Sequence, residues 1–209
     1  MASIEGERNE EVVGQLTLEQ KARLDEVMKQ AELSLQSDEL LNKAAAGKLL
    51  GNNYIAVSGV LSNYSKGPLT LVAQHQYSGS VIMDYTNPID AADSNNNPGR
   101  GYFIMEGDGS VEAAAVYNGK NNKGDQDCGW LFGFNINKRI QPEKMSFYAV
   151  CGPMANFINP DWAAIKIKIE HGGHIGYYPD PKTGTQIYGG ISKDPKTGRY
   201  SVSVAFYGA

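Results

Sequence analysis

The pentapeptide Asp-Pro-Lys-Thr-Gly occurs twice near the end of the chain, at residues 180–184 and again at residues 194–198. Each copy has the composition of a tight turn. Proline presets φ for the second turn position, the aspartate side chain accepts bonds from the backbone N–H groups that follow it, and glycine takes positive φ without steric cost. Residues 200–206, after the second copy, alternate large apolar with small residues, as a strand with one buried face does. Residues 175–207 therefore predict a three-stranded antiparallel meander.

Short apolar segments separated by turn residues extend this pattern back to residue 54. They lie at residues 54–61, 69–74, 81–83, 101–105, 111–117, 130–134, 145–151 and 165–169. The last of them alternates isoleucine with lysine, and we interpret it as a further strand. Gly-Asp-Gly at 107–109 predicts a hairpin between two of the segments. Ten or eleven short strands with frequent turns favour a sandwich or a barrel, and we predict a mainly β protein with an antiparallel β-sandwich.

The first 51 residues have a different pattern. Residues 1–15 are charged and poor in apolar side chains, which predicts a flexible N-terminus. Residues 16–51 predict a helical pair, because Thr17 and Gln20 form a capping box and apolar residues then recur at helical spacing. We expect this pair to pack against a β-sandwich domain of residues 52–209. The alternative is a helix pair that docks a partner or a membrane surface.

Composition excludes some classes of function. The formal charge of −4 and the pI near 5.4 argue against nonspecific nucleic-acid binding, which needs a basic face. No apolar run is long enough for a transmembrane segment, and the N-terminus has no secretory signal pattern. We therefore expect a cytoplasmic protein in which Cys128 and Cys151 are free thiols.

Motifs for catalysis or for metal binding are weak. His171 and His174 flank two glycines, and we interpret this stretch as a surface loop because flexible glycines preorganise metal ligands poorly. Asp125 and Asp127 are likewise interpreted as loop residues, since a complete calcium loop is missing. The sequence contains neither a Gly-x-Ser-x-Gly nucleophile elbow nor a phosphate-binding loop. We expect no enzymatic activity, no metal and no cofactor.

Aromatic residues are the best candidates for ligand binding. Flat rings can hold a sugar ring or a partner surface when polar side chains lie nearby. Trp130 lies in an apolar strand and is expected in the core. The predicted ligand-binding residues are Trp162, Tyr177, Tyr178 and Tyr188.

Three segments resemble the small jasmonate-induced proteins of plants. They are Leu-Thr-Leu-Val-Ala-Gln-His at 69–75, Cys-Gly-Trp-Leu-Phe-Gly-Phe-Asn at 128–135 and Asp-Trp-Ala-Ala-Ile-Lys at 161–166. Members of that family have a similar mass and also begin with a helical stretch. The resemblance implies a non-enzymatic protein of stress and defence responses. We expect it to act as a binding module for a sugar, a lipid headgroup or a protein partner.

A weaker resemblance is to the aegerolysin and actinoporin-like sandwiches. It rests on Asp-Cys-Gly-Trp at 127–130 and on Tyr177, Tyr178 and Tyr188, which are similar to interfacial aromatics in the second group. This resemblance implies the alternative function of a membrane-binding or pore-forming β-sandwich. An enzyme of unknown type is the remaining alternative.

Overall fold

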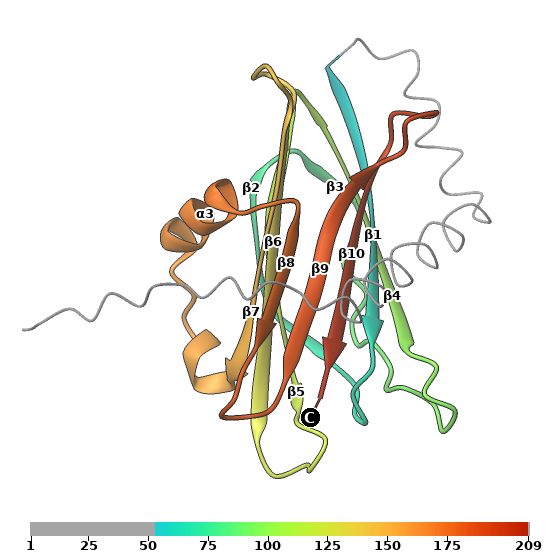
Figure 1. Cartoon of the computed structure of the whole chain (residues 1–209), viewed down its shortest axis with the longest axis vertical. Helices are drawn as coiled ribbons and strands as arrows, with labels where there is room; N and C mark the ends of the chain where they lie inside the picture. The colour runs from blue at the N-terminus through green and yellow to red at the C-terminus, as the bar shows by residue number, and fades with distance from the viewer. Residues whose placement is uncertain (1–52, 209) are drawn as a thin grey trace, which may run out of the picture.

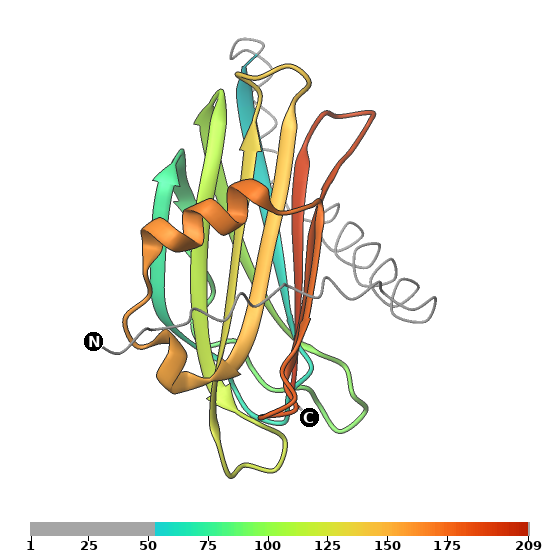
Figure 2. The ribbon, with the colours of Figure 1, turned by 60° about the vertical axis from the view of Figure 1, so that its left-hand side comes forward.

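The computed structural model describes residues 53–208. In this part of the chain ten strands form two sheets, and one α-helix lies across the outer face of the smaller sheet (Figures 1 and 2). The prediction of a mainly β sandwich is therefore confirmed. The predicted flexible N-terminus and the predicted helical pair, residues 1–51, lie outside the described residues.

The larger sheet has six strands in the order β3-β4-β1-β10-β9-β8. Their bounds are β1 (Tyr54–Asn63), β3 (Ser80–Met83), β4 (Gly99–Asp108), β8 (Ile175–Pro179), β9 (Gln186–Lys193) and β10 (Tyr200–Tyr207). The smaller sheet has the order β2-β5-β6-β7, with β2 (Thr70–Ser78), β5 (Ser110–Lys120), β6 (Asp127–Asn137) and β7 (Lys144–Pro153). A 3-10 turn, η2 (Met154–Phe157), and the helix α3 (Trp162–His171) connect β7 to β8.

The predicted C-terminal meander is confirmed, because β8, β9 and β10 pair as antiparallel neighbours. Its two repeated turns close as expected. Gly184 and Gly198 have φ values of 75° and 70°, and each donates its N–H to the carbonyl oxygen of the turn's aspartate at 2.8 Å. The expectation of purely antiparallel pairing is wrong at one place, since β10 pairs in parallel with β1. Local patterns do not reveal a pairing between the two ends of a domain.

Residues 165–169 belong to α3, and the prediction of a strand there is wrong. The Asp161 carboxylate caps this helix by accepting bonds from the N–H groups of Ala163 and Ala164, both at 3.1 Å. Ile165 and Ile169 are buried, whereas Ile167 between them is 58% exposed. The two buried isoleucines are four residues apart, which places them on one face of a helix as readily as on one face of a strand.

The predicted hairpin at residues 107–109 is also wrong. Gly109 does turn the chain with a φ of 76°, but β4 and β5 on either side of it belong to different sheets. The turn therefore carries the chain across the sandwich.

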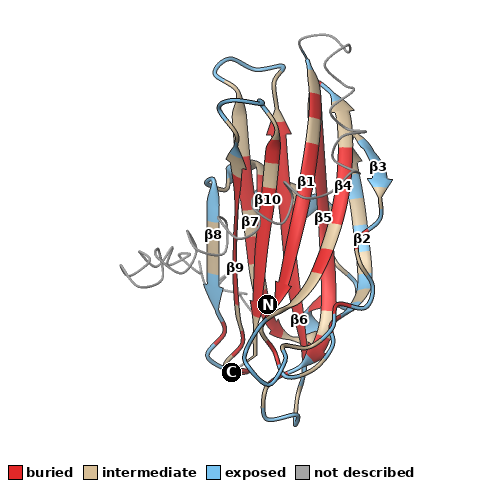
Figure 3. Ribbon diagram, turned by 90° about the vertical axis from the view of Figure 1, so that its right-hand side faces the viewer, coloured by how far each residue is buried: buried red, intermediate tan, exposed pale blue. Residues whose placement is uncertain are grey.

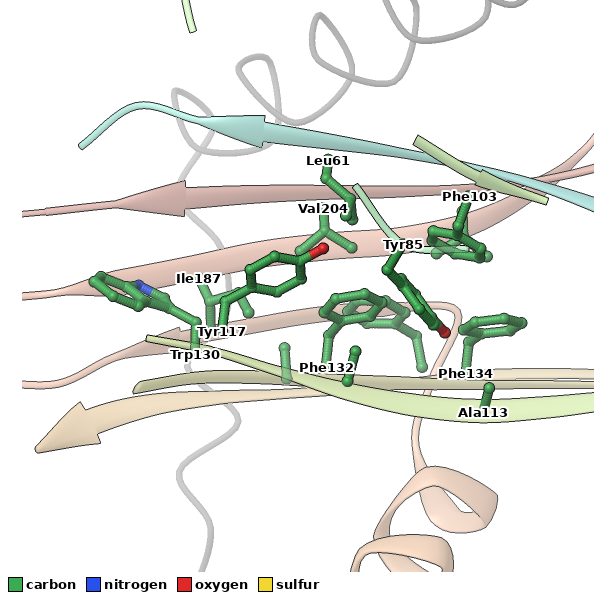
Figure 4. Close-up of a cluster of buried hydrophobic side chains, with 14 of the residues drawn as sticks. Leu61, Tyr85, Phe103, Ala113, Tyr117, Trp130, Phe132, Phe134, Ile187 and Val204 are labelled. Atoms are coloured by element: carbon green, nitrogen blue, oxygen red, sulfur yellow. The ribbon is translucent and has the colours of Figure 1, made fainter. Parts of the chain in front are cut away.

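The core lies between the two sheets and is rich in aromatic rings. Figure 4 shows rings from β5 and β6 of the smaller sheet facing side chains from the larger sheet. Trp130 is in this core, as predicted, and its indole N–H donates to the Gln186 carbonyl oxygen at 3.2 Å. Figure 3 shows burial concentrated in the central strands β1 and β10 and less of it in the edge strand β8. Packing of such rings supplies most of the stability of a sandwich.

Candidate functional site

A cleft of about 470 Å³ lies outside the core, on the side where α3 crosses the smaller sheet. Its walls are β6 and β7, η2, the first turns of α3, and the segment that leads from β8 into the first repeated turn. The apolar lining includes Leu131, Val150, Phe157 and Ile165. The polar lining includes Tyr148, Asn156, Asp161, Lys168, Tyr178, Asp180 and Lys182.

Two glycines in β6 allow the helical segments to lie this close to the sheet. Gly129 and Gly133 point to the outer face, where a Cβ would clash with Phe157 and Ile169 respectively. The side chains of Phe157 and Ile169 are buried in the same cluster as Leu131. The small residues of β6 therefore set the depth of the cleft.

Both carboxylates of the cleft already accept hydrogen bonds from the protein. Asp161 caps α3, as described above. Asp180 accepts bonds from the N–H of Thr183 at 2.8 Å and from its hydroxyl at 2.6 Å. The carboxylates therefore hold the walls of the cleft in place.

The cationic groups lie at the rim of the cleft. Lys168 donates from its Nζ to the Tyr148 hydroxyl at 3.2 Å, and the same Nζ lies 5.3 Å from the centre of the Tyr148 ring. Lys182 lies exposed in the first repeated turn. Two lysine ammonium groups at one cleft can bind an anionic oxygen such as that of a phosphate.

The structure does not gather the four predicted ligand-binding residues. Only Tyr178 lines the cleft, and it is 39% exposed. Tyr177 points to the opposite face of β8, where its ring stacks on Tyr188 with centroids 4.4 Å apart. Tyr188 is itself buried. Trp162 begins α3 and stacks on His75 of β2 at 5.3 Å.

Several cleft residues were missed from the sequence. The sequence pattern predicts strands at both Lys168 and Tyr148, with no indication that their side chains meet. Lys182 was visible as a member of the repeated turn, but its twin Lys196 has the same local sequence at the opposite end of β9. Lys182 differs from Lys196 only because the first repeated turn packs against β7 and the second does not.

Among the other sequence candidates, Cys151 also lines the cleft, whereas Cys128, His171 and His174 do not. Cys128 and Cys151 are buried free thiols in adjacent strands. They are not paired directly, since Cys128 lies opposite Pro153 and Cys151 lies opposite Trp130. Burial raises the pKa of Cys151 to about 12, which makes it a poor nucleophile. The His171 ring nitrogen lies 2.7 Å from the Ile167 carbonyl oxygen at the end of α3. Across residues 53–208 no three His, Cys, Asp or Glu side chains are grouped so as to hold a metal ion.

Comparison with solved structures gives a match over nearly the whole chain. The lipid binding protein Nakanori has a crystal structure that aligns with a TM-score of 0.57 and 14% sequence identity. The alignment covers 98% of this chain and 93% of that one. The two proteins share a fold. At 14% identity the match establishes the shared fold alone.

The sequence comparisons give no match. No family model matches the chain, and no curated protein matches it. The resemblance to the jasmonate-induced proteins therefore stays a prediction, as does membership of the aegerolysin or actinoporin-like groups. Within residues 53–208, no helix combines the length and the apolar character that crossing a membrane requires.

Proposed function

We propose that this protein is a non-enzymatic binding module that recognises phosphate-bearing lipid headgroups at a membrane surface. The observation that carries the proposal is the cleft, in which Lys168 and Lys182 stand at the rim above an apolar floor. The shared fold with a lipid binding protein supports the same class of ligand.

The charges of the cleft favour a zwitterionic headgroup over a simple anion. The two ammonium groups attract the phosphate oxygens. Asp161 and Asp180, together with the rings of Tyr148 and Tyr178, offer negative charge and aromatic faces to a positively charged amine on the same headgroup. A free phosphate would bind the two ammonium groups but would have no use for the carboxylates and the aromatic rings.

Exposed apolar groups beside the cleft suit contact with the membrane. Ile158 lies between η2 and α3, next to the cleft residue Phe157, and is 66% exposed. Tyr178 stands at the opposite wall with its ring partly in solvent. Tyrosine favours the boundary between headgroups and acyl chains. Moving an exposed isoleucine from water into this boundary is also favourable, because it removes apolar surface from water. The headgroup would then be held while both wall residues contact the bilayer.

Vesicle sedimentation tests this function. We expect binding to phosphatidylcholine vesicles and none to vesicles of a galactolipid, which carries sugar in place of phosphate. Ile158→Ser should reduce binding to phosphatidylcholine, while Ile82→Ser, at a 51% exposed isoleucine on β3, should leave it unchanged. Equal binding to both vesicle types would contradict phosphate recognition, and binding to the galactolipid vesicles alone would favour a sugar ligand.

Soluble competitors separate a membrane ligand from a free one. Phosphocholine at millimolar concentration should displace the protein from the vesicles, and inorganic phosphate should do so less well. Strong competition by inorganic phosphate alone, with no vesicle binding, would indicate a site for soluble phosphate compounds.

The biological context of the proposal comes from the sequence. We include in it a role in plant stress or defence, as the family resemblance implies, and a cytoplasmic location. Transcript levels after jasmonate treatment and cell fractionation test these two parts.

A further inference from the structure

A buried carboxylate lies beneath α3, the helix whose other residues line the cleft. Glu112 projects from β5 to the outer face of the smaller sheet and is only 5% exposed. Its Oε2 lies 3.9 Å from the Nζ of Lys166 on α3, and its Oε1 is buried without a hydrogen-bond partner. A charged carboxylate in this position lacks most of the solvation that it would have in water.

Glu112 belongs to a row of polar side chains that crosses the whole sheet in register. Ser78, Glu112, Asn135 and Ser146 are successive partners on β2, β5, β6 and β7. The hydroxyl oxygens of Ser78 and Ser146 are also buried without hydrogen-bond partners. The row therefore does little to compensate a negative charge on Glu112.

The next position along β5 on the same face is apolar and binds α3. Ala114 follows Glu112 on the outer face, and it packs in one cluster with Ile165 and Ile169 of the helix. Because Lys166 of α3 lies against the Glu112 carboxylate, we expect water to gain access to this carboxylate when α3 moves away from the sheet.

The groups that face Glu112 come from three elements. Burial raises its pKa to about 7, against the effect of Lys166, while Glu170 on α3 raises it further and Lys144 on β7 lowers it. Lys166 also pairs with Glu170 at 3.7 Å, so its charge is shared between two carboxylates. On β2, Tyr77 has a pKa raised to about 12 by its own burial and by the Glu112 charge. Among these neighbours Lys166 makes the only ion pair with Glu112 recorded in residues 53–208.

We propose that Glu112 is a proton-sensitive latch that controls how firmly α3 lies on the sheet, and through it the shape of the headgroup cleft. When Glu112 is protonated, the neutral side chain is tolerated under the helix and α3 stays docked. When it is ionised, lifting α3 returns the carboxylate to water, and the wall formed by α3 loosens. The step from α3 to ligand binding rests on the proposed function of the cleft, whereas the latch itself does not.

Hydrogen exchange measured by mass spectrometry tests the latch without any lipid. We expect the α3 peptide, after correction for the intrinsic pH dependence of exchange, to be at least about tenfold better protected at pH 5.5 than at pH 8.5. Peptides from β6 in the core should show no such change. In Glu112→Gln the α3 peptide should be equally protected at both pH values, since a neutral side chain is then present throughout.

Two further variants make the test specific. Glu170→Gln removes a carboxylate from the exposed side of the same helix, so the pH response should persist in it. Lys166→Met removes the ion-pair partner of Glu112, so the change in protection should move to higher pH. A pH response in Glu112→Gln equal to that of the parent protein would overturn the latch, and so would an unshifted response in Lys166→Met.

Vesicle binding at the same two pH values connects the latch to the proposed function. The parent protein should bind phosphatidylcholine vesicles more tightly at pH 5.5, and Glu112→Gln should bind equally at both pH values. If exchange follows Glu112 as expected but no vesicles are bound, the latch stands and the proposed function fails. If vesicles are bound but the pH response of hydrogen exchange is the same in Glu112→Gln as in the parent protein, the function stands and the latch fails.

Discussion

Asp180 and Asp194 occupy the same position in two identical turns, yet only Asp180 is buried, with 7% of its surface exposed. Both carboxylates accept bonds from the threonine three residues later, through its N–H and its hydroxyl. The first turn packs against β7 and forms a wall of the cleft, whereas the second stands in solvent. Identical local sequences therefore take identical conformations in very different environments.

The first prediction concerns this pair of aspartates. Asp180→Ala leaves the N–H and the hydroxyl of Thr183 without their acceptor in a buried site, so we expect a loss of about 1–3 kcal/mol in the free energy of unfolding. Asp194→Ala should cause a clearly smaller loss, because water replaces its carboxylate. Denaturant unfolding of both variants measures the difference. Equal losses would show that the turn conformation, and not its burial, determines the contribution of the aspartate.

A second prediction tests the approach of α3 to the sheet. Gly133→Ala places a methyl group against Ile169, and we expect the overpacking to destabilise the protein by about 1–3 kcal/mol. The α3 peptide should lose protection from hydrogen exchange more than any core strand. Gly67→Ala is the matched control, since a Cβ at Gly67 would have no atom within 4 Å. If Gly133→Ala were as stable as Gly67→Ala, α3 would not depend on the gap that Gly133 leaves.

The third prediction is the pH dependence of stability. The folded-state pKa of Glu112, about 7, lies above its ordinary value of 4.5. Its contribution to stability is therefore fully present below pH 4.5 and is lost as the pH rises through 7. We expect the parent protein to lose about 1–3 kcal/mol relative to Glu112→Gln between pH 4.5 and pH 8. Urea unfolding of both proteins at the two pH values gives this difference. If the difference in stability between the two proteins were the same at both pH values, the pKa of Glu112 would not be raised by burial.

Local patterns predicted those parts of the fold in which local chemistry decides the structure. The β8–β10 meander follows from turn residues and from alternation, both of which lie within a few residues of the strands that they define. The spacing of Ile165 and Ile169 fits either a strand or a helix, and the structure has a helix there, capped by Asp161. The parallel pairing of β1 with β10 depends on the order of strands in space, which no short segment specifies.

The candidate site was less accessible from the sequence, for a geometric reason. Tyr177 and Tyr178 are adjacent in a strand and so point to opposite faces, which separates one predicted binding residue from the other. The row that contains Glu112 becomes visible only when the registers of four strands are known. Binding residues that come from different elements are brought together by packing, and the sequence shows them one at a time.

The repeated turn provides the most direct test of the proposed lipid site. Lys182 lines the cleft, and Lys196 has the same neighbours in sequence at the other end of β9. Sedimentation with phosphatidylcholine vesicles should be measured for Lys182→Ala and Lys196→Ala side by side, after circular dichroism has shown both to be folded. We predict that Lys182→Ala weakens binding about tenfold or more, as expected when a charged hydrogen bond to phosphate is lost, and that Lys196→Ala binds like the parent protein. Equal binding by the two variants would contradict the assignment of the cleft as the headgroup site.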